Sequence, residues 1–272
     1  MLSSVFSASD LRETRYGTET KIMAQNIENE HRDRNTAVLL AAGKGTRLGS
    51  EIPKQYRSIG GLPMAALSYK ALAQSSVITD IVMVIPQGDE DFVRSRVLGS
   101  LDDASLLQKL RGFAFGGTER YYSVANGLDA ITWPCRYVFI HDGARPFIDT
   151  ASLQRLYDAV QETGAAIAGM PSKDTVKMAD EDKMVANTPD RSKVWIVQTP
   201  QVFDKGLITE AYHRMLQELP ELEKRGIHIT DDAMVAEEMS NARVRLVEAS
   251  YRNIKITTPE DIAVAEAFLG KR

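Results

Sequence analysis

The sequence predicts an α/β domain of three layers, in which helices cover both faces of a mostly parallel β-sheet. From Thr36 onward, short apolar runs alternate with segments of helical hydrophobic spacing. Most of these runs are continuously apolar, which is typical of strands that are covered on both faces. Such strands, when they alternate with helices of about ten residues or more, favour parallel βαβ connections.

Six apolar runs bounded by turn-forming residues are predicted as strands: 36–42, 80–86, 111–117, 136–142, 164–171 and 242–249. The intervening hydrophobic patterns predict helices over 62–74, 89–98, 120–130 and 150–163. Asp149 is predicted to cap the last of these helices, since a short acceptor side chain satisfies free backbone N–H groups. A final helix is predicted over 257–269, because threonines precede Pro259 and acidic residues follow it.

Two segments do not fit this alternation. Residues 1–34 are polar, mixed in charge and without hydrophobic periodicity, so we expect a disordered extension that is neither a secretory signal nor a transit peptide. Residues 173–203 contain two β-rich pieces around the acidic turn ADEDK, which predicts a β-hairpin arm that packs on something outside its own core. Residues 35–272 are expected to form one domain with this arm inserted.

Composition limits the classes of function. The chain has 272 residues and a formal charge of −4, which gives no global attraction for nucleic acid or anionic membrane. No apolar run reaches the roughly 18 residues of a membrane span. The single cysteine, Cys135, excludes an internal disulfide and is predicted to be a buried or half-buried thiol. We expect a cytoplasmic protein that binds neither nucleic acid nor membrane.

A glycine-rich turn with several cations follows the first predicted strand. The sequence LLAAGKGTRLGSEIPKQY, residues 39–56, holds three glycines together with Lys44, Arg47 and Lys54. In an open α/β sheet, ligands bind beyond the carboxyl ends of the strands. Glycines let the backbone approach phosphate oxygens and donate hydrogen bonds to them. The turn is therefore predicted to bind a phosphorylated ligand, although a glycine pair alone is also typical of an ordinary tight βα turn.

Two familiar phosphate-binding loops do not match this turn. A Walker loop needs Gly-Lys after four intervening residues, where this chain has Leu48 and Gly49, and a dinucleotide loop needs a small residue where Leu48 stands. The turn nevertheless combines backbone N–H donors with two or three cations, and it directly follows a buried strand. This combination suits the several negative charges of a triphosphate.

The turn LAAGKGTRLGSEIPKQY resembles the signature loop of the nucleotidylyltransferases, which join a nucleoside triphosphate to a phosphorylated alcohol or sugar. Further motifs occur in the order seen in the 2-C-methyl-D-erythritol 4-phosphate cytidylyltransferase family: GGTERYYSVANGL, HDGARPF, DTVKM, TPDRSKVWIVQTPQVF, ITDDA and NIKITTPEDIAVAE. The resemblance runs from about Thr36 to the C-terminus. It implies a Rossmann-like nucleotidyltransferase domain that transfers the cytidylyl group of CTP to 2-C-methyl-D-erythritol 4-phosphate in the non-mevalonate isoprenoid pathway.

By this resemblance, the reaction is an in-line attack on the α-phosphorus of CTP that expels pyrophosphate. Such a reaction needs positioning and charge neutralisation rather than covalent catalysis. Arg47 and Lys54 match the two cations of the family that act in the transition state. The alternative for Lys54, judged from the residue alone, is a solvated loop lysine.

The resemblance also implies the nucleotide contacts. The residues expected to recognise the base and ribose are mostly small, which lets main-chain groups read the edge of a pyrimidine: Leu40, Ala41, Ala42, Gly43, Gly117, Arg120 and Ser123. Arg120 is open to the alternative of capping its helix or pairing with Glu119. Asp142 follows a strand and is expected to bind Mg²⁺ or another divalent cation that bridges the phosphates. The neighbouring His141 is predicted to be structural, because no nucleophile motif accompanies it.

The acceptor phosphate and hydroxyls are expected, again by resemblance, to meet Asp142, Arg145, Thr175, Arg191, Thr230 and Lys255. Arg191 and Lys255 would orient the attacking phosphate, and Lys255 is expected at the end of a strand. In the family the arm crosses a homodimer, so Thr175 and Arg191 would serve the partner's site. The alternative is that these are surface charges on a dimer interface.

Three other functions remain open at the level of sequence. A ribitol 5-phosphate cytidylyltransferase shares the fold, the loop and most of the cations. A sugar 1-phosphate nucleotidyltransferase is disfavoured by the short chain and by DGARPF. A nucleotide-binding regulator without turnover is disfavoured by Arg47, Lys54, Asp142 and Lys255, which are all present.

Overall fold

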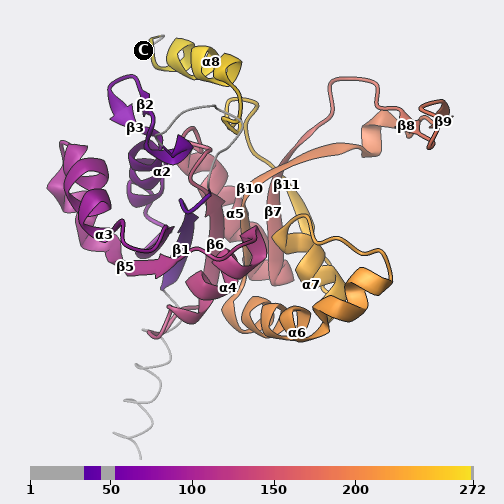
Figure 1. The fold of residues 1–272 in the computed structure, drawn as a ribbon, viewed down its shortest axis with the longest axis horizontal. Helices are drawn as coiled ribbons and strands as arrows, with labels where there is room; N and C mark the ends of the chain where they lie inside the picture. The colour runs from indigo at the N-terminus through magenta and orange to yellow at the C-terminus, as the bar shows by residue number, and fades with distance from the viewer. Residues whose placement is uncertain (1–33, 44–52, 271–272) are drawn as a thin grey trace, which may run out of the picture.

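The computed structural model describes residues 34–43 and 53–270. A seven-stranded sheet lies at its centre, with strands in the order β11-β7-β10-β6-β1-β4-β5 (Figure 1). These strands are β1 (Asn35–Leu40), β4 (Asp80–Ile85), β5 (Leu110–Phe115), β6 (Tyr137–Asp142), β7 (Ala165–Pro171), β10 (Trp195–Asp204) and β11 (Arg245–Glu248). A short hairpin pairs β2 (Ser58–Ile59) with β3 (Leu62–Pro63). All six predicted strands are present, with small shifts at their ends.

The sheet is mostly parallel, as predicted. β1 pairs in parallel with both β4 and β6, β4 with β5, and β11 with β7. β10 runs antiparallel between β6 and β7. The prediction for residues 173–203 is therefore wrong for 195–203, which form a central strand of the sheet. The pattern of alternating strands and helices does not reveal this strand, because the segment between β7 and β10 forms the arm and not a helix.

Helices cover both faces of the sheet. One face carries α2 (Met64–Ala73) and α5 (Thr150–Thr163), and the other carries α4 (Arg120–Asp129), α6 (Lys205–Lys224) and α7 (Asp232–Ser240). α8 (Pro259–Gly270) lies beside the β2–β3 hairpin at one end of the molecule (Figure 1). As predicted, Asp149 caps α5: its Oδ1 accepts a hydrogen bond from the Ser152 N–H at 2.6 Å.

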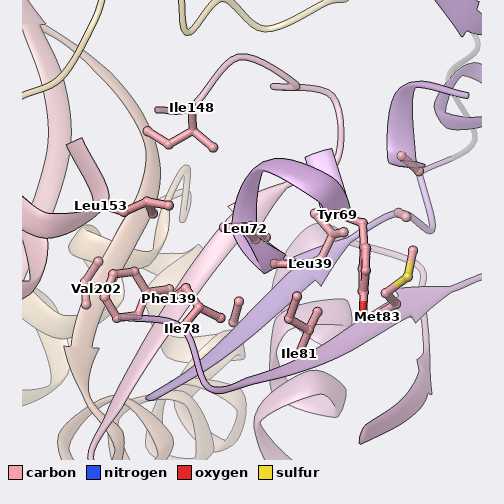
Figure 2. Close-up of a cluster of buried hydrophobic side chains, with 14 of the residues drawn as sticks. Leu39, Tyr69, Leu72, Ile78, Ile81, Met83, Phe139, Ile148, Leu153 and Val202 are labelled. Carbon is pink, nitrogen blue, oxygen red and sulfur yellow. The ribbon is translucent and has the colours of Figure 1, made fainter. Parts of the chain in front are cut away.

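Side chains of each central strand alternate between two cores. Leu39 of β1 and Phe139 of β6 face α2 and α5, in the cluster shown in Figure 2. Val38 and Ile140, their chain neighbours, face α4 and α6 in the second cluster. Because both faces are buried, neither needs polar residues, which explains the continuous apolar runs in the sequence.

The helical predictions were incomplete. The helices α6 and α7 were not identified, although the buried residues Ile208, Ala211, Tyr212 and Met215 of α6 have helical spacing. Pro220 inside α6 interrupts the pattern near its end. The segment 89–98 is not one regular helix: α3 (Glu90–Phe92) continues as a π-helical turn over Val93–Val97 and a 3₁₀ turn over Leu98–Ser100. A 3₁₀ stretch over Ala104–Lys109 precedes β5.

An extended arm leaves the body between β7 and β10 (Figure 1). Its tip is a small hairpin of β8 (Met178–Ala179) and β9 (Val185–Asn187), and a 3₁₀ turn over Arg191–Lys193 leads back to the sheet. Asp180 organises the tip, because its Oδ1 accepts hydrogen bonds from the backbone N–H groups of Asp182 and Met184. The arm is thus shorter than the predicted 173–203.

Cys135 lies next to the second core. It is half-buried, its Sγ donates to the Tyr137 carbonyl at 3.3 Å, and burial raises the pKa of its thiol. This agrees with the predicted buried or half-buried thiol. No helix among the described residues has the length and apolar composition needed to cross a membrane.

Gly127 of α4 sets how closely that helix approaches the sheet. A Cβ at this position would lie 2.5 Å from Val38 Cγ1 and 2.9 Å from Val84 Cγ2, both in the buried sheet. Because β-branched side chains are stiff, we expect Gly127→Ala to lower the free energy of unfolding by about 1–3 kcal/mol, as measured by urea denaturation. Gly270→Ala is the control, since nothing lies within 4 Å of a Cβ there. Unchanged stability of Gly127→Ala would contradict this packing.

Candidate active site

A cavity of about 250 Å³ opens where β1 and β6 end side by side. The last residues of these strands, Leu40 and Asp142, are paired in the sheet register. The lining of the cavity combines small residues, charged side chains and the start of α4: Leu40, Ala41, Ala42, Gly43, Lys54, Gln55, Gly117, Thr118, Glu119, Arg120, Ser123, Asp142, Ala144 and Lys255. Parallel strands bring their carboxyl ends to one sheet edge, which is where ligands bind in such folds.

Small residues make one wall of the cavity. The Ala41 N–H donates to the Val84 carbonyl at 2.7 Å, which continues the sheet one residue beyond β1. A Cβ on Gly116 would lie 2.3 Å from Ala42 Cβ, so the turn after β5 closes directly against the turn after β1. A side chain at position 116 would have no room, so Gly116 allows these two turns to meet at the edge of the cavity.

The start of α4 makes a second wall. Ser123 Oγ accepts a hydrogen bond from the Gly117 N–H at 3.0 Å and donates to the Glu119 carbonyl at 3.3 Å. A Cβ on Gly117 would lie 2.2 Å from Tyr122 Cβ. Ser123 therefore holds the 117–119 turn so close to Tyr122 that a Cβ on Gly117 would clash with it.

Three cations surround the carboxylate of Asp142. Lys255 Nζ lies 2.8 Å from Oδ2, Arg120 Nε 3.4 Å from Oδ1 and Arg145 Nε 3.9 Å from Oδ2. Burial by itself would raise the pKa of this carboxyl. The charges of Arg120 and Lys255, with a hydrogen bond from Lys255, outweigh burial and hold the pKa well below its usual range. Asp142 is therefore ionised throughout the neutral range.

His141 supports this carboxylate from behind. Its Nε2 donates to the Arg145 carbonyl at 3.0 Å, because a carbonyl oxygen only accepts, and its Nδ1 therefore accepts from Thr199 Oγ1 at 3.1 Å. Thr199 Oγ1 in turn accepts from the Asp142 N–H at 3.0 Å. Complete burial lowers the pKa of His141 to about 4, so the ring is neutral. This arrangement supports the structural role predicted for His141.

Arg120 has a partner that the sequence analysis missed. Its Nη1 and Nη2 donate to the two carboxylate oxygens of Asp232 at 2.7 and 2.8 Å, and Tyr212 Oη donates to Asp232 Oδ1 at 2.5 Å. Burial favours the neutral guanidine, but Asp232 and Asp142 outweigh it and raise the pKa of Arg120 further. The alternative of a pair with Glu119 is not the arrangement found. The motif ITDDA contained the signal, since Asp232 is an acid in an otherwise apolar helix face.

Lys54 enters the cavity from a 3₁₀ turn, η2 (Lys54–Tyr56). The turn is anchored by Tyr56, whose hydroxyl donates to Asp89 Oδ2 at 2.8 Å and whose ring lies 5.1 Å from that of Phe92. Gln55, which the sequence analysis did not single out, lines the cavity beside Lys54 and is 3% exposed. Arg47 lies outside the described residues, so its predicted role stays a prediction.

The predicted acceptor residues are not all in one place. Lys255 lines the cavity, as predicted. It lies in a loop, however, and not at the predicted end of a strand. The Ile256 N–H holds this loop in place by donating to the Ala144 carbonyl at 2.9 Å. Arg145 is turned toward this loop, donating to the Asn253 carbonyl at 2.9 Å. Thr230 is exposed just before α7. Thr175 and Arg191 are exposed on the arm and are not among the residues that line this chain's cavity.

The cavity therefore combines small residues with the fixed cations Lys54, Arg120 and Lys255. Small residues suit a planar base and a ribose, and the cations around the ionised carboxylate of Asp142 suit phosphates. Among the residues that line it, Ser123 is the only serine or cysteine, and its hydroxyl is hydrogen-bonded to the backbone of Gly117 and Glu119 and not to a general base. The arrangement suits group transfer between phosphates better than covalent catalysis.

Comparison with known proteins agrees with this chemistry. The family model of 2-C-methyl-D-erythritol 4-phosphate cytidylyltransferase matches residues 36–271. A protein of that name from Lachnospira eligens is 43% identical over 86% of this chain and 99% of its own length. Another, from Caldanaerobacter subterraneus subsp. tengcongensis, is 41% identical over 87% of this chain and 99% of its own.

Solved structures give the same result. The 4-diphosphocytidyl-2C-methyl-D-erythritol synthase of Anaerococcus prevotii superposes with a TM-score of 0.74 at 32% identity, covering 88% of this chain and 99% of that one. The 2-C-methyl-D-erythritol 4-phosphate cytidylyltransferase of Francisella tularensis gives a TM-score of 0.68 at 26% identity, with 86% and 99% covered. Sequence and structure together establish that this chain belongs to the 2-C-methyl-D-erythritol 4-phosphate cytidylyltransferase family.

Proposed function

We propose that this protein transfers the cytidylyl group of CTP to 2-C-methyl-D-erythritol 4-phosphate, with release of pyrophosphate. The product is 4-diphosphocytidyl-2-C-methyl-D-erythritol, a precursor in isoprenoid biosynthesis. The observation that carries the proposal is the convergence of Lys54, Arg120, Asp142 and Lys255 on one cavity whose other wall is small residues and backbone. Family membership supports the same reaction.

In this reaction an oxygen of the acceptor phosphate attacks the α-phosphorus of CTP. The bond from that phosphorus to the oxygen bridging the α- and β-phosphates breaks, and the electron pair leaves with pyrophosphate. Negative charge grows on the leaving group, and Lys54 at the cavity wall would stabilise it as a fixed charge. Lys255 would hold the attacking phosphate, and Arg47 belongs to the same proposal by resemblance alone.

Leu40, Ala41, Ala42 and Gly43 would contact the base and ribose together with Gly117 and Ser123, because all six residues line the cavity. This assignment rests on position and on the resemblance. Cytosine presents both donors and acceptors along its edge, and main-chain N–H and C=O groups offer both partners. Arg120 lies between this wall and Asp142.

We further propose Mg²⁺ or another divalent cation as the cofactor. Among the described residues there is no cluster of three or more His, Cys, Asp or Glu side chains that would hold a metal alone. One ionised carboxylate still fits Mg²⁺, which keeps several waters and is commonly bound by one or two carboxylates and substrate phosphates. Asp142 would be that carboxylate. The ion would neutralise charge on the triphosphate when bound.

Homodimerisation through the arm is part of the proposal. Met178, Met184 and Val185 on the arm are 56%, 66% and 61% exposed, which is unusual for three apolar side chains on one small hairpin. A second copy of the chain would cover them. Thr175 and Arg191 would then reach the partner's cavity, while Thr230 and Arg145 would serve their own. The cytoplasmic location stays a prediction.

The substrate assignment is tested by pyrophosphate release from CTP over a panel of polyol phosphates with Mg²⁺. We expect kcat/KM for 2-C-methyl-D-erythritol 4-phosphate to exceed that for ribitol 5-phosphate by at least about 10²-fold, because cavity shape and buried polar groups discriminate acceptors. EDTA should abolish the release with either acceptor. A preference for ribitol 5-phosphate would reject the assignment, and no release with any acceptor would favour a nucleotide-binding regulator.

The role of Lys54 is tested by Lys54→Ala. We expect kcat to fall by about 10²–10³, the usual loss when one preorganised transition-state charge is removed. The melting temperature should stay within experimental error of the wild type. Lys224→Ala, an exposed lysine of α6 that pairs only with Glu221 among the described salt bridges, is the matched control. A rise in KM for CTP with unchanged kcat would make Lys54 a ground-state contact instead.

The crossed arm is tested by mixing inactive Lys54→Ala with inactive Arg191→Ala under subunit exchange. If Arg191 serves the partner, each mixed dimer holds one intact site and one doubly damaged site. Random pairing makes about half of the dimers mixed, so about a quarter of wild-type activity should return.

Lys54→Ala mixed with Lys255→Ala is the control for this experiment. Both side chains line the same cavity of one chain, so no mixed dimer contains an intact site. Recovery in this control would mean that the two lysines serve different chains. No recovery with Arg191→Ala, while exchange is verified by a labelled subunit, would reject the crossed arm.

A further inference from the structure

We propose that Asp232 is a positioning residue of the nucleotide cavity: it orients the guanidinium of Arg120, and through it the carboxylate of Asp142. The inference concerns this chain's own contacts, and its link to catalysis rests on the proposed function. Asp232 does not line the cavity itself, whereas Arg120 and Asp142 do. It lies 112 residues beyond Arg120 in the sequence, at the first position of α7.

The hydrogen bonds of Arg120 leave its orientation little freedom. A guanidinium has five N–H donors in a rigid plane. Two of them are held by the two oxygens of Asp232 at 2.7 and 2.8 Å, and the Nε donor points to Asp142 at 3.4 Å. The plane of Arg120 is thus set by two carboxylates on different elements, β6 and α7. One N–H on each Nη remains for a ligand in the cavity.

Asp232 is itself held firmly. It is completely buried, and its Oδ1 also accepts from Tyr212 Oη on α6. The neighbouring Ala233 N–H donates to Gln201 Oε1 at 2.8 Å, and Gln201 Nε2 donates to Asp231 Oδ2 at 2.9 Å. Gln201 lies in β10, so the start of α7 is tied to the sheet. A rigid bidentate partner of this kind fixes direction as well as charge.

The charges explain why such a partner is needed. Asp142 attracts Arg120, Arg145 and Lys255, and Asp232 competes with it for the guanidinium of Arg120. With a neutral residue at position 232, the guanidinium of Arg120 would be free to rotate and to pair with Asp142 in the bidentate geometry that guanidinium and carboxylate prefer. Arg120 would then leave the cavity wall, and Asp142 would be less available to Lys255 or to a metal.

The test is a double-mutant cycle of Asp232→Asn and Arg120→Gln in the full-length protein. Asp232→Asn should lower kcat/KM for CTP by about 10- to 100-fold, the size of effect typical when a contact residue is displaced by about an ångström. It should also raise the Kd for CTP alone, measured by calorimetry. In the Arg120→Gln background, Asp232→Asn should change kcat/KM by less than about twofold, because the residue that it positions is gone.

Glu237→Gln is the matched control. It removes one negative charge from the same helix, α7, at an exposed position, and Glu237 makes no described hydrogen bond or ion pair with Arg120 or Asp232. We expect its Kd for CTP to equal that of the wild type. Equal losses from Asp232→Asn in both backgrounds, or an unchanged Kd for CTP in a folded Asp232→Asn protein, would overturn the proposal.

If Asp232→Asn fails to fold, Tyr212→Phe makes a milder change, since it removes only one hydrogen bond to Asp232. It should raise the Kd for CTP about two- to fivefold, an effect that vanishes in the Arg120→Gln background. No effect of Tyr212→Phe in either background would also count against the proposal. Because the Kd is measured with CTP alone, a different acceptor preference would reject the proposed function and leave this result standing.

Discussion

The ionised carboxylate of Asp142 is the interaction on which the site depends. A buried negative charge is costly unless it is paired, and here Lys255, Arg120 and Arg145 pair with it. These cations come from α4, from the turn after β6 and from the loop before α8. The carboxylate therefore joins α4 and the loop before α8 to the end of β6, and it also keeps cations beside the space where phosphates would bind.

The antiparallel strand β10 supports this arrangement from inside the sheet. Thr199 of β10 accepts a hydrogen bond from the Asp142 N–H and donates one to the neutral ring of His141. Gln201 of the same strand accepts a hydrogen bond from the Ala233 N–H and so holds the start of α7. The same strand continues backward into the arm. Any second copy that binds the arm would therefore contact the segment that carries the scaffold of the site, which gives a physical reason for a dimer and a complete site to occur together.

The cavity divides recognition between two kinds of group. Small residues make part of the lining, where Gly116 allows the turns after β1 and β5 to touch and Gly117 allows the second turn to approach Tyr122 of α4. Fixed charges make another part. Backbone groups are set by the sheet and do not reorganise, while the long cationic side chains need partners to hold their direction. Asp142 and Asp232 are those partners.

The sequence by itself determined the layers, the six apolar strands, the cap at Asp149 and the position of the glycine-rich turn, because these follow from local hydrophobic period and turn chemistry. Its motifs also placed Lys54, Asp142 and Lys255 near one another. Only the tertiary structure decided the central place of β10 and the pairing of Arg120 with Asp232. Those depend on which distant segments the sheet topology brings together, and a pattern of neighbouring residues carries no measure of such contacts.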